Sequence, residues 1–126
     1  MLKFVTALSL SLALASGAWA CSCRPPAEGE DDAAYVKRMI KESDAAFTGR
    51  VLSSKRTDPD INRGEVIGRV RILKAYKGVR RGRVITLKTG PNGAMCGLDL
   101  TKGDTISVAA DKSRDGTFSA GSCSRI

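Results

Sequence analysis

Four cysteines constrain this chain of 126 residues more than any other feature of its sequence. Cys21 and Cys23 are separated by one residue, whereas Cys96 and Cys123 lie far along the chain. They lack the paired CxxC spacing of a structural zinc site, and four cysteines in a small exported domain typically form two disulfides. Three pairings are open. A bond between Cys21 and Cys23 is disfavoured, because a disulfide needs a particular separation and dihedral angle and this ring would be strained.

Residues 1–20 have the features of a secretory signal peptide. Lys3 is their only charged residue, residues 4–15 are mostly apolar, and Ala18-Trp19-Ala20 has the A-x-A pattern of a cleavage site. The apolar run is too short to cross a bilayer, which takes about 20 residues. The sequence therefore predicts one mature domain, residues 21–126, secreted to the periplasm or the extracellular space, with no transmembrane segment.

The same cleavage site has a second interpretation, in which the chain is a lipoprotein. Bacterial lipoproteins also carry a cysteine at the first mature position, where it is acylated. They usually have leucine three residues earlier, whereas this chain has Ala18 followed by the bulky Trp19. Lipid anchoring at Cys21 is thus the minority prediction. An acylated Cys21 could neither form a disulfide nor offer a free amine.

The chain is basic, with a formal net charge of +8, of which Lys3 in the predicted signal peptide contributes one unit. The simpler interpretation is a solvated basic surface that keeps the protein soluble. The alternative is weak attraction to polyanions such as anionic glycans or lipid headgroups. A nucleic-acid partner is not predicted, because aromatic residues make up 5% of the chain and the basic residues are spread over several predicted strands.

Histidine is absent, which removes the commonest general base and a common zinc ligand. No Ser–His or Cys–His arrangement can therefore be built for nucleophilic catalysis. Asp99, Asp104 and Asp111 could act as acids, but each is better placed in a turn or at a solvated strand end. The sequence predicts a protein that is not an enzyme and needs no cofactor.

Hydrophobic periodicity predicts a mainly β domain with one N-terminal helix. Residues 28–42 have helical spacing, with acids early and bases late, which suits the helix dipole. Alternation with a period of two then predicts five strands, at residues 45–52, 66–73, 84–88, 105–110 and 117–120. Asp115-Gly116 indicates a hairpin between the last two. We expect a closed five-stranded barrel, with Gly49 and Gly68 at bends; an open α+β sheet is the alternative.

The chain resembles the N-terminal domain of the tissue inhibitors of metalloproteinases, a netrin-like module. No single motif carries this resemblance, but the order and spacing of several motifs extend across the whole predicted mature chain. The matching residues are Cys21-Ser22-Cys23 with Pro25, Ala45-Ala46-Phe47-Thr48-Gly49-Arg50-Val51, Lys74-Ala75-Tyr76-Lys77-Gly78, Met95-Cys96-Gly97 followed by Leu98, Leu100 and Gly103, and finally Cys123.

The resemblance implies a five-stranded OB-like barrel with the N-terminal segment held across it by two disulfides. The implied pairs are Cys21–Cys96 and Cys23–Cys123. They would close loops of roughly 75 and 100 residues, and a chain-entropy treatment assigns each about 4–5 kcal/mol. This is large beside a typical net stability of about 5–15 kcal/mol.

The resemblance also implies a function, inhibition of a zinc metalloendopeptidase by a monomer. The α-amine and carbonyl oxygen of Cys21 would chelate the protease's catalytic zinc, whose open position otherwise holds water. An amine with a pKa of about 8 is partly neutral at physiological pH. Ser22 would enter the pocket beside the zinc. The expected protease-binding ridge consists of Cys21, Ser22, Cys23, Arg24, Pro25, Ala94 and Met95.

The chain departs from the family pattern in three respects. It lacks a further disulfide of the N-terminal domain and a second domain, and it places the bulky cation Arg24 near the expected cleft. Cys21 and Cys23 could then serve only to attach the N-terminus to the barrel. The alternative function is therefore a non-inhibitory netrin-like binding or structural module of the cell envelope or extracellular space.

Overall fold

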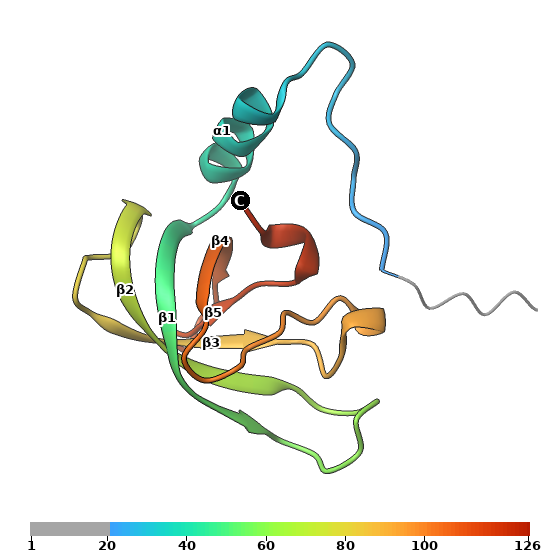
Figure 1. Ribbon diagram of the computed structural model, residues 1–126, viewed down its shortest axis with the longest axis vertical. Coiled ribbons are helices and arrows are strands. Elements are labelled where there is room, and N and C mark those ends of the chain that lie inside the picture. The colour runs from blue at the N-terminus through green and yellow to red at the C-terminus, as the bar shows by residue number, and fades with distance from the viewer. Residues whose placement is uncertain (1–20) are drawn as a thin grey trace, which may run out of the picture.

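The structure is a computed structural model that describes residues 21–126, so the predicted signal peptide, residues 1–20, lies outside the described residues. One helix precedes five strands, and two short 3-10 helices lie in the second half of the chain (Figure 1). In chain order the elements are α1 (Asp32–Glu42), β1 (Ala45–Arg56), β2 (Val66–Lys77), β3 (Val84–Thr89), η1 (Gly93–Met95), β4 (Thr105–Lys112), β5 (Phe118–Ser119) and η2 (Ser122–Ser124).

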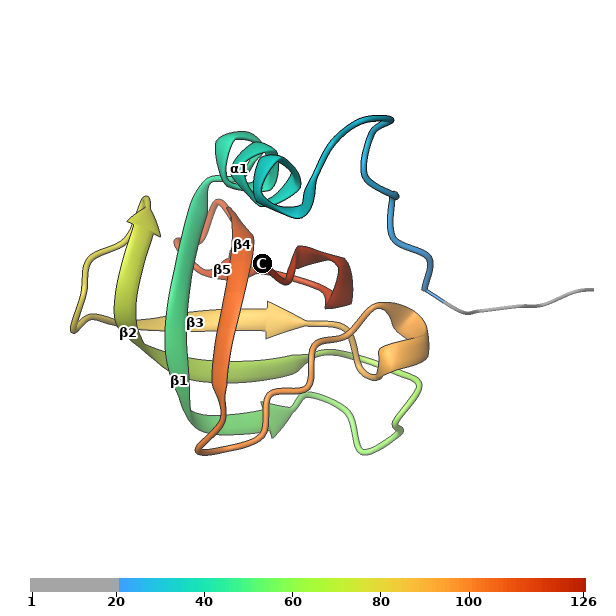
Figure 2. The ribbon, with the colours of Figure 1, turned by 45° about the horizontal axis from the view of Figure 1, so that its top comes forward.

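The five strands close into a barrel in the order β1-β2-β3-β5-β4, with β4 returning to β1 (Figure 2). All neighbouring strands are antiparallel except β3 and β5, which run parallel. The short strand β5 completes the closure, since it pairs with β3 at two positions and with β4 at two. The structure thus confirms the predicted five-stranded OB-like barrel with one N-terminal helix, and the open-sheet alternative is wrong.

Alternate residues of the strands fill the interior, as the period-two pattern predicts. Phe47, Val70, Ile72, Leu87 and Val108 are all at most 1% exposed and form the centre of the core. Burying a side chain of this size stabilises a fold by roughly 1.5–3 kcal/mol. Most residues between them on β2 are exposed, whereas Ala46 and Ala109, which pair across β1 and β4, are buried as well.

Two glycines allow the long strands β1 and β2 to bend around this core. The β1–β2 register shifts between Thr48 and Gly49. A Cβ atom on Gly49 would lie 3.0 Å from the carbonyl oxygen of Arg71, and one on Gly68 would lie 3.0 Å from a methyl group of Leu100. The predicted role of Gly49 and Gly68 at barrel bends is consistent with these close approaches.

Helix α1 begins at Asp32, four residues later than the predicted start at residue 28. The reason is local hydrogen bonding. The Asp31 side chain caps the helix by accepting from the N–H of Ala34 at 2.8 Å, while Gly29 adopts a left-handed φ of 77° in a preceding turn. Of the early acids, Glu30 therefore precedes the helix, Asp31 is its cap and Asp32 begins it.

Lys77 at the end of β2 attaches α1 to the barrel. Its Nζ donates to the carbonyl oxygens of Ile40 at 3.2 Å and Lys41 at 2.9 Å, where the final carbonyl groups of a helix lack partners within the helix. The next residue, Gly78, has a φ of 67° and packs against the backbone of Asp44. The Lys-Gly pair noted in the sequence thus joins the end of β2 to the helix–strand junction.

The predicted hairpin between the last two strands is also confirmed. Gly116 has a φ of 85°, and the N–H of Ser113 donates to the carbonyl oxygen of Thr117 at 2.8 Å. Strand β5 is shorter than predicted, because only Phe118 and Ser119 are in strand geometry. The chain then leaves the sheet and leads directly into η2, which contains Cys123.

Candidate functional site

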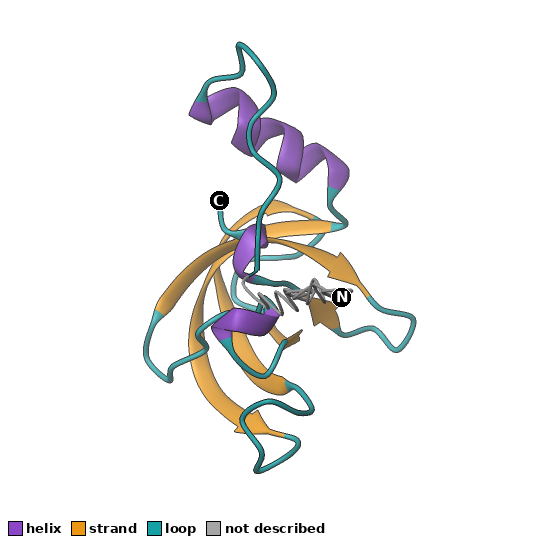
Figure 3. Ribbon diagram, turned by 90° about the vertical axis from the view of Figure 1, so that its right-hand side faces the viewer, coloured by secondary structure: helices purple, strands orange, loops and turns teal. Residues whose placement is uncertain are grey.

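The start of the described chain lies across the barrel beside the two 3-10 helices (Figure 3). A disulfide joins Cys21 to Cys96, directly after η1, with the two Cα atoms 5.1 Å apart. A second joins Cys23 to Cys123 within η2, with a Cα–Cα distance of 5.2 Å. This is the pairing that the resemblance implies. Both bonds connect the first three described residues to distant parts of the chain.

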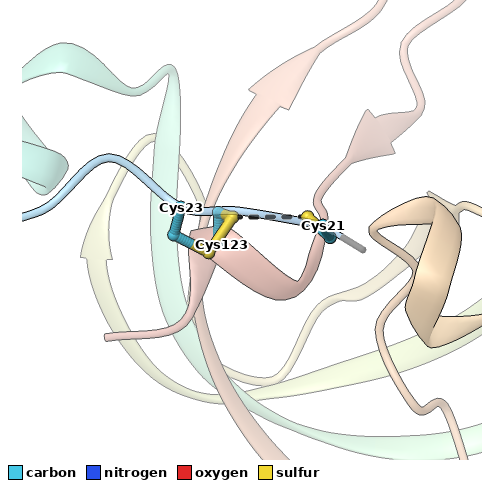
Figure 4. A group of neighbouring side chains, drawn as sticks. All are labelled: Cys21, Cys23 and Cys123. Atoms are coloured by element: carbon cyan, nitrogen blue, oxygen red, sulfur yellow. Dashed lines mark hydrogen bonds between the residues drawn. A yellow bond between two sulfur atoms is a disulfide. The ribbon is translucent and has the colours of Figure 1, made fainter. Parts of the chain in front are cut away.

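The two disulfides are in contact with each other. The Sγ atoms of Cys21 and Cys123 lie 3.6 Å apart (Figure 4), and the Ser122 hydroxyl lies 3.4 Å from the Cys21 Sγ. The sulfurs of Cys21, Cys23 and Cys123 all lie within 4.8 Å of one another. Metals bind thiolates, however, and in residues 21–126 all four cysteines are oxidised, so this sulfur cluster has no thiolate to offer.

Close backbone packing holds the loop that carries Cys96. The carbonyl oxygen of Cys96 accepts a hydrogen bond from the N–H of Ser122 at 2.9 Å, which joins the loop to η2. A Cβ atom on Gly121 would lie 2.7 Å from that oxygen, and one on Gly97 would lie 2.7 Å from the carbonyl oxygen of Asn92. Glycine is therefore required at both positions. The bridge to Cys21 is thereby attached to a rigid backbone.

Asn92 positions the exposed part of this loop. Its Oδ1 accepts from the N–H of Met95 at 3.0 Å, while its Nδ2 donates to the carbonyl oxygen of Ile61 at 2.8 Å and to the Oδ1 of Asn62 at 3.1 Å. One side chain thus joins η1 to the β1–β2 loop. A pocket of about 360 Å³ is lined by Asn62, Asn92, Ala94 and Met95.

Sequence reasoning missed both Asn92 and Ile61. Ile61 is 60% exposed and Met95 is 42% exposed, so two large apolar side chains face solvent on loops that Asn92 connects. The Pro91-Asn92-Gly93 turn signal, with asparagine directly before a short helical turn, could have identified Asn92 as a cap. No local signal places Ile61 beside η1, because that proximity is set by the barrel.

The disulfides place Cys21 beside the loop that carries Cys96, and Cys23 beside η2. Cys21 is half-buried, whereas the rest of the predicted ridge is exposed: Ser22, Cys23, Arg24, Pro25, Ala94 and Met95. The disulfide to Cys96 places Cys21 next to Ala94 and Met95. Within residues 21–126, Ser22 and Arg24 form no side-chain hydrogen bond or ion pair, so both side chains are available to a partner.

The far end of the N-terminal segment is anchored to α1. The Glu30 carboxylate accepts from the Nε and Nη2 of Arg38, each at 3.0 Å, and from the N–H of Ala27 at 3.2 Å. The hydrogen bond from Arg38 holds the pKa of Glu30 below its usual value, and the Ala27 N–H adds to this effect. The segment is therefore fixed at both ends, by sulfur at one and by an ion pair at the other.

The three aspartates considered as acids do not form a site. Asp99 accepts from the Thr101 hydroxyl at 2.7 Å within a turn, and Asp111 lies on β4 opposite Ser119. Asp104 is exposed next to the start of β4. Within the described part of the chain, the sulfur cluster is the one group of three potential metal ligands, and it contains no aspartate.

Comparison with known proteins identifies no relative, since no family model and no curated protein matches the chain. No helix among the described residues is long and apolar enough to cross a membrane.

Proposed function

We propose that this protein inhibits zinc metalloendopeptidases through an N-terminal cysteine. The observation that carries the proposal is the Cys21–Cys96 disulfide, which joins the first residue of the predicted mature chain to an exposed loop. Cleavage after Ala20 would create an α-amine two atoms away from the Cys21 carbonyl carbon. The amine nitrogen and the carbonyl oxygen can then close a five-membered chelate on a metal ion with an open position.

Rigidity supports this mechanism. Cys21 is bonded to Cys96, its sulfur contacts Cys123, and the loop on the other side is fixed by Asn92 and by close glycine packing. A segment already ordered before binding avoids most of the entropy cost of ordering on the protease. Ser22 follows the chelating residue and is exposed, so it can enter the pocket beside the zinc.

The proposed partner surface is a continuous ridge with an apolar end. Cys23, Arg24 and Pro25 would lie along one side of the protease cleft, and Ala94 and Met95 along the other. Ile61 extends this apolar end and is added here to the predicted ridge. The protein would act as a monomer outside the cytoplasm, without catalytic activity and without a cofactor of its own.

The test uses the purified mature chain, residues 21–126, against a panel of zinc endopeptidases. One alanine added before Cys21 moves the free amine away from the chelating position. We expect at least a 100-fold rise in the inhibition constant, because the zinc contact is lost. The matched control adds one alanine after Ile126 and leaves inhibition unchanged. Inhibition that survives the N-terminal extension contradicts the chelation mechanism.

The intact mass of the exported protein tests the premise of a free Cys21 amine. Cleavage after Ala20 with two disulfides gives one expected mass, whereas acylation adds the mass of the lipid and prevents the Cys21–Cys96 bond. The lipoprotein alternative predicts the heavier form. The second candidate function is a non-inhibitory binding module of the cell envelope or extracellular space with weak affinity for polyanions, favoured by the cationic barrel face described next.

A further inference from the structure

Three adjacent strands of the barrel carry positive charge and no negative charge. Strands β1, β2 and β3 contain no aspartate or glutamate, and residues 66–98 contain none at all. The cations appeared spread along the sequence, but β1 pairs with β2 and β2 with β3, so they share one curved surface. The basic residues on these strands are Arg50, Lys55, Arg56, Arg69, Arg71, Lys74, Lys77 and Lys88.

Some of these cations serve the fold. Arg56 donates to the carbonyl oxygen of Pro91 at 2.7 Å, Lys77 donates to the end of α1, and Lys88 pairs with Asp115 at 3.2 Å. Arg50, Arg69 and Arg71, here called the arginine cluster, are different. All three are exposed, and within the described residues none forms an ion pair or a side-chain hydrogen bond.

The strand register gathers the arginine cluster on one face. Arg50 on β1 lies directly opposite Arg71 on β2, so the pleat directs both side chains outward on the same side. Arg69 lies two residues along the same strand and therefore on that face as well. A register shift between Val51 and Ser53 keeps Arg69 outward opposite Ser53.

This arrangement carries a stability cost that the fold does not explain. Like charges directly opposite each other in an antiparallel pair are destabilising. An acid at either position would form a favourable pair, yet arginine occupies both. A cluster of exposed cations without acidic partners on two paired strands is typical of a surface that binds anions.

We propose that the arginine cluster binds an anionic polysaccharide. A guanidinium group matches sulfate and carboxylate oxygens with two parallel hydrogen bonds. Side chains about 7 Å apart along a strand and about 5 Å apart across strands suit the repeated charges of a linear polymer. This inference deepens the binding-module candidate given above and does not depend on protease inhibition.

Other polyanions fit this face less well. Sequence-tolerant binding of single-stranded nucleic acid uses several aromatic platforms. Near the arginine cluster, β1 and β2 offer one exposed aromatic residue, Tyr76, and its hydroxyl lies 3.0 Å from the Thr48 hydroxyl. A membrane surface requires several apolar side chains beside the cations. Two large apolar residues share this row of β2; Ile67 is half-buried and Leu73 is only 37% exposed.

The test measures binding of the mature chain to immobilised dextran sulfate, with neutral dextran as the matched polymer. The Arg50→Gln/Arg69→Gln/Arg71→Gln variant removes three charges from the cluster. The control Lys37→Gln/Lys41→Gln/Lys102→Gln removes three exposed charges from α1 and the segment before β4. At low salt we expect the cluster variant to lose at least about tenfold in affinity, with a shallower salt dependence, and the control to lose less than about threefold.

Four results would overturn the proposal. The first two are no binding of the unmodified protein to dextran sulfate at about 50 mM salt, and equal losses of affinity in the cluster variant and the control. The other two are equally strong binding to neutral dextran, and cluster-dependent binding to phosphatidylglycerol vesicles that is tighter than binding to dextran sulfate. A variant with lysine at all three positions keeps the charge. It is expected to bind more weakly, because an ammonium group cannot donate the two parallel hydrogen bonds that a guanidinium group donates. The alanine extension before Cys21 leaves dextran sulfate binding intact, which separates this proposal from protease inhibition.

Discussion

The sulfurs of Cys21 and Cys123 lie 3.6 Å apart although each is bonded to a different partner. That distance brings a thiolate on Cys21 within reach of the Cys23–Cys123 bond. Such a thiolate could attack the Cys123 sulfur, form a Cys21–Cys123 bond and release Cys23 as a thiolate. The two disulfides are therefore coupled whenever Cys21 is free.

The variant Cys96→Ala tests this coupling, because it leaves Cys21 without its native partner. We expect a mixture in which the free thiol lies partly on Cys21 and partly on Cys23. Alkylation of the free thiol, digestion and tandem mass spectrometry locate it. The matched control Cys21→Ala frees Cys96, which lies outside the sulfur cluster, and should keep the Cys23–Cys123 bond intact. A free thiol found only on Cys21 in the first variant would contradict the coupling.

Close packing of the Cys96 loop predicts a sharp difference between two glycines that lie four residues apart. The Gly97→Ala change places a methyl group 2.7 Å from the carbonyl oxygen of Asn92 and should lower the free energy of unfolding by about 1–3 kcal/mol. Nothing lies within 4 Å of a Cβ atom placed on Gly93, so Gly93→Ala should change the free energy of unfolding by less than about 0.5 kcal/mol. Urea unfolding measures both, and equal effects would show that the loop can shift to make room.

Asn92 is expected to order the exposed end of the ridge. Asn92→Ala removes its bonds to Met95, Ile61 and Asn62, at a cost of about 1–2 kcal/mol, and should speed hydrogen exchange at the Met95 amide. The control Asn62→Ala removes only the bond at 3.1 Å and should leave that exchange rate almost unchanged. Equal exchange rates in the two variants would assign the ordering to the disulfide instead.

Asp115 predicts how the β4–β5 hairpin responds to acid. The hydroxyl of Thr117, the N–H of Thr117 and then Lys88 lower the pKa of Asp115 to about 2. Because the folded pKa is depressed, the stabilisation is complete above the usual value of about 4 and is lost as the pH falls towards 2. Asp115→Asn should therefore destabilise the protein at pH 6 and make little difference near pH 2.

The contributions to that pKa can be separated by carboxyl ¹³C shifts across an acid titration. Thr117→Val removes the hydroxyl bond of 2.6 Å and should raise the pKa of Asp115 more than Lys88→Gln does. A larger rise in the Lys88→Gln variant would mean that the ion pair with Lys88, rather than the hydrogen bonds from Thr117, is the main cause of the low pKa of Asp115.

Much of the barrel could be predicted from the sequence because strands leave a local signature. Alternating Val70 and Ile72 predict a strand, and Asp115-Gly116 predicts a hairpin, from a few neighbouring residues each. The start of α1 could not be fixed in this way. Glu30 resembles an acid of the first helical turn, yet it bonds to Arg38 from outside the helix, and Asp31 serves as the cap.

The site required information that no short segment contains. Three cysteine pairings were open, and only the resemblance selected the pair formed, because pairing depends on which distant segments the barrel brings together. The arginine cluster was missed for the same reason. Arg50 and Arg71 are 21 residues apart in the sequence, and the strand register alone places them opposite each other.

The two disulfides also set an order of events during biosynthesis. Cys21 and Cys23 are made first, but their partners follow 75 and 100 residues later. Synthesis runs from the N-terminus, so neither native bridge can form before its partner, Cys96 or Cys123, has been made. The segment that we propose binds the protease is thus the earliest part of the domain to be synthesised and the last to be secured.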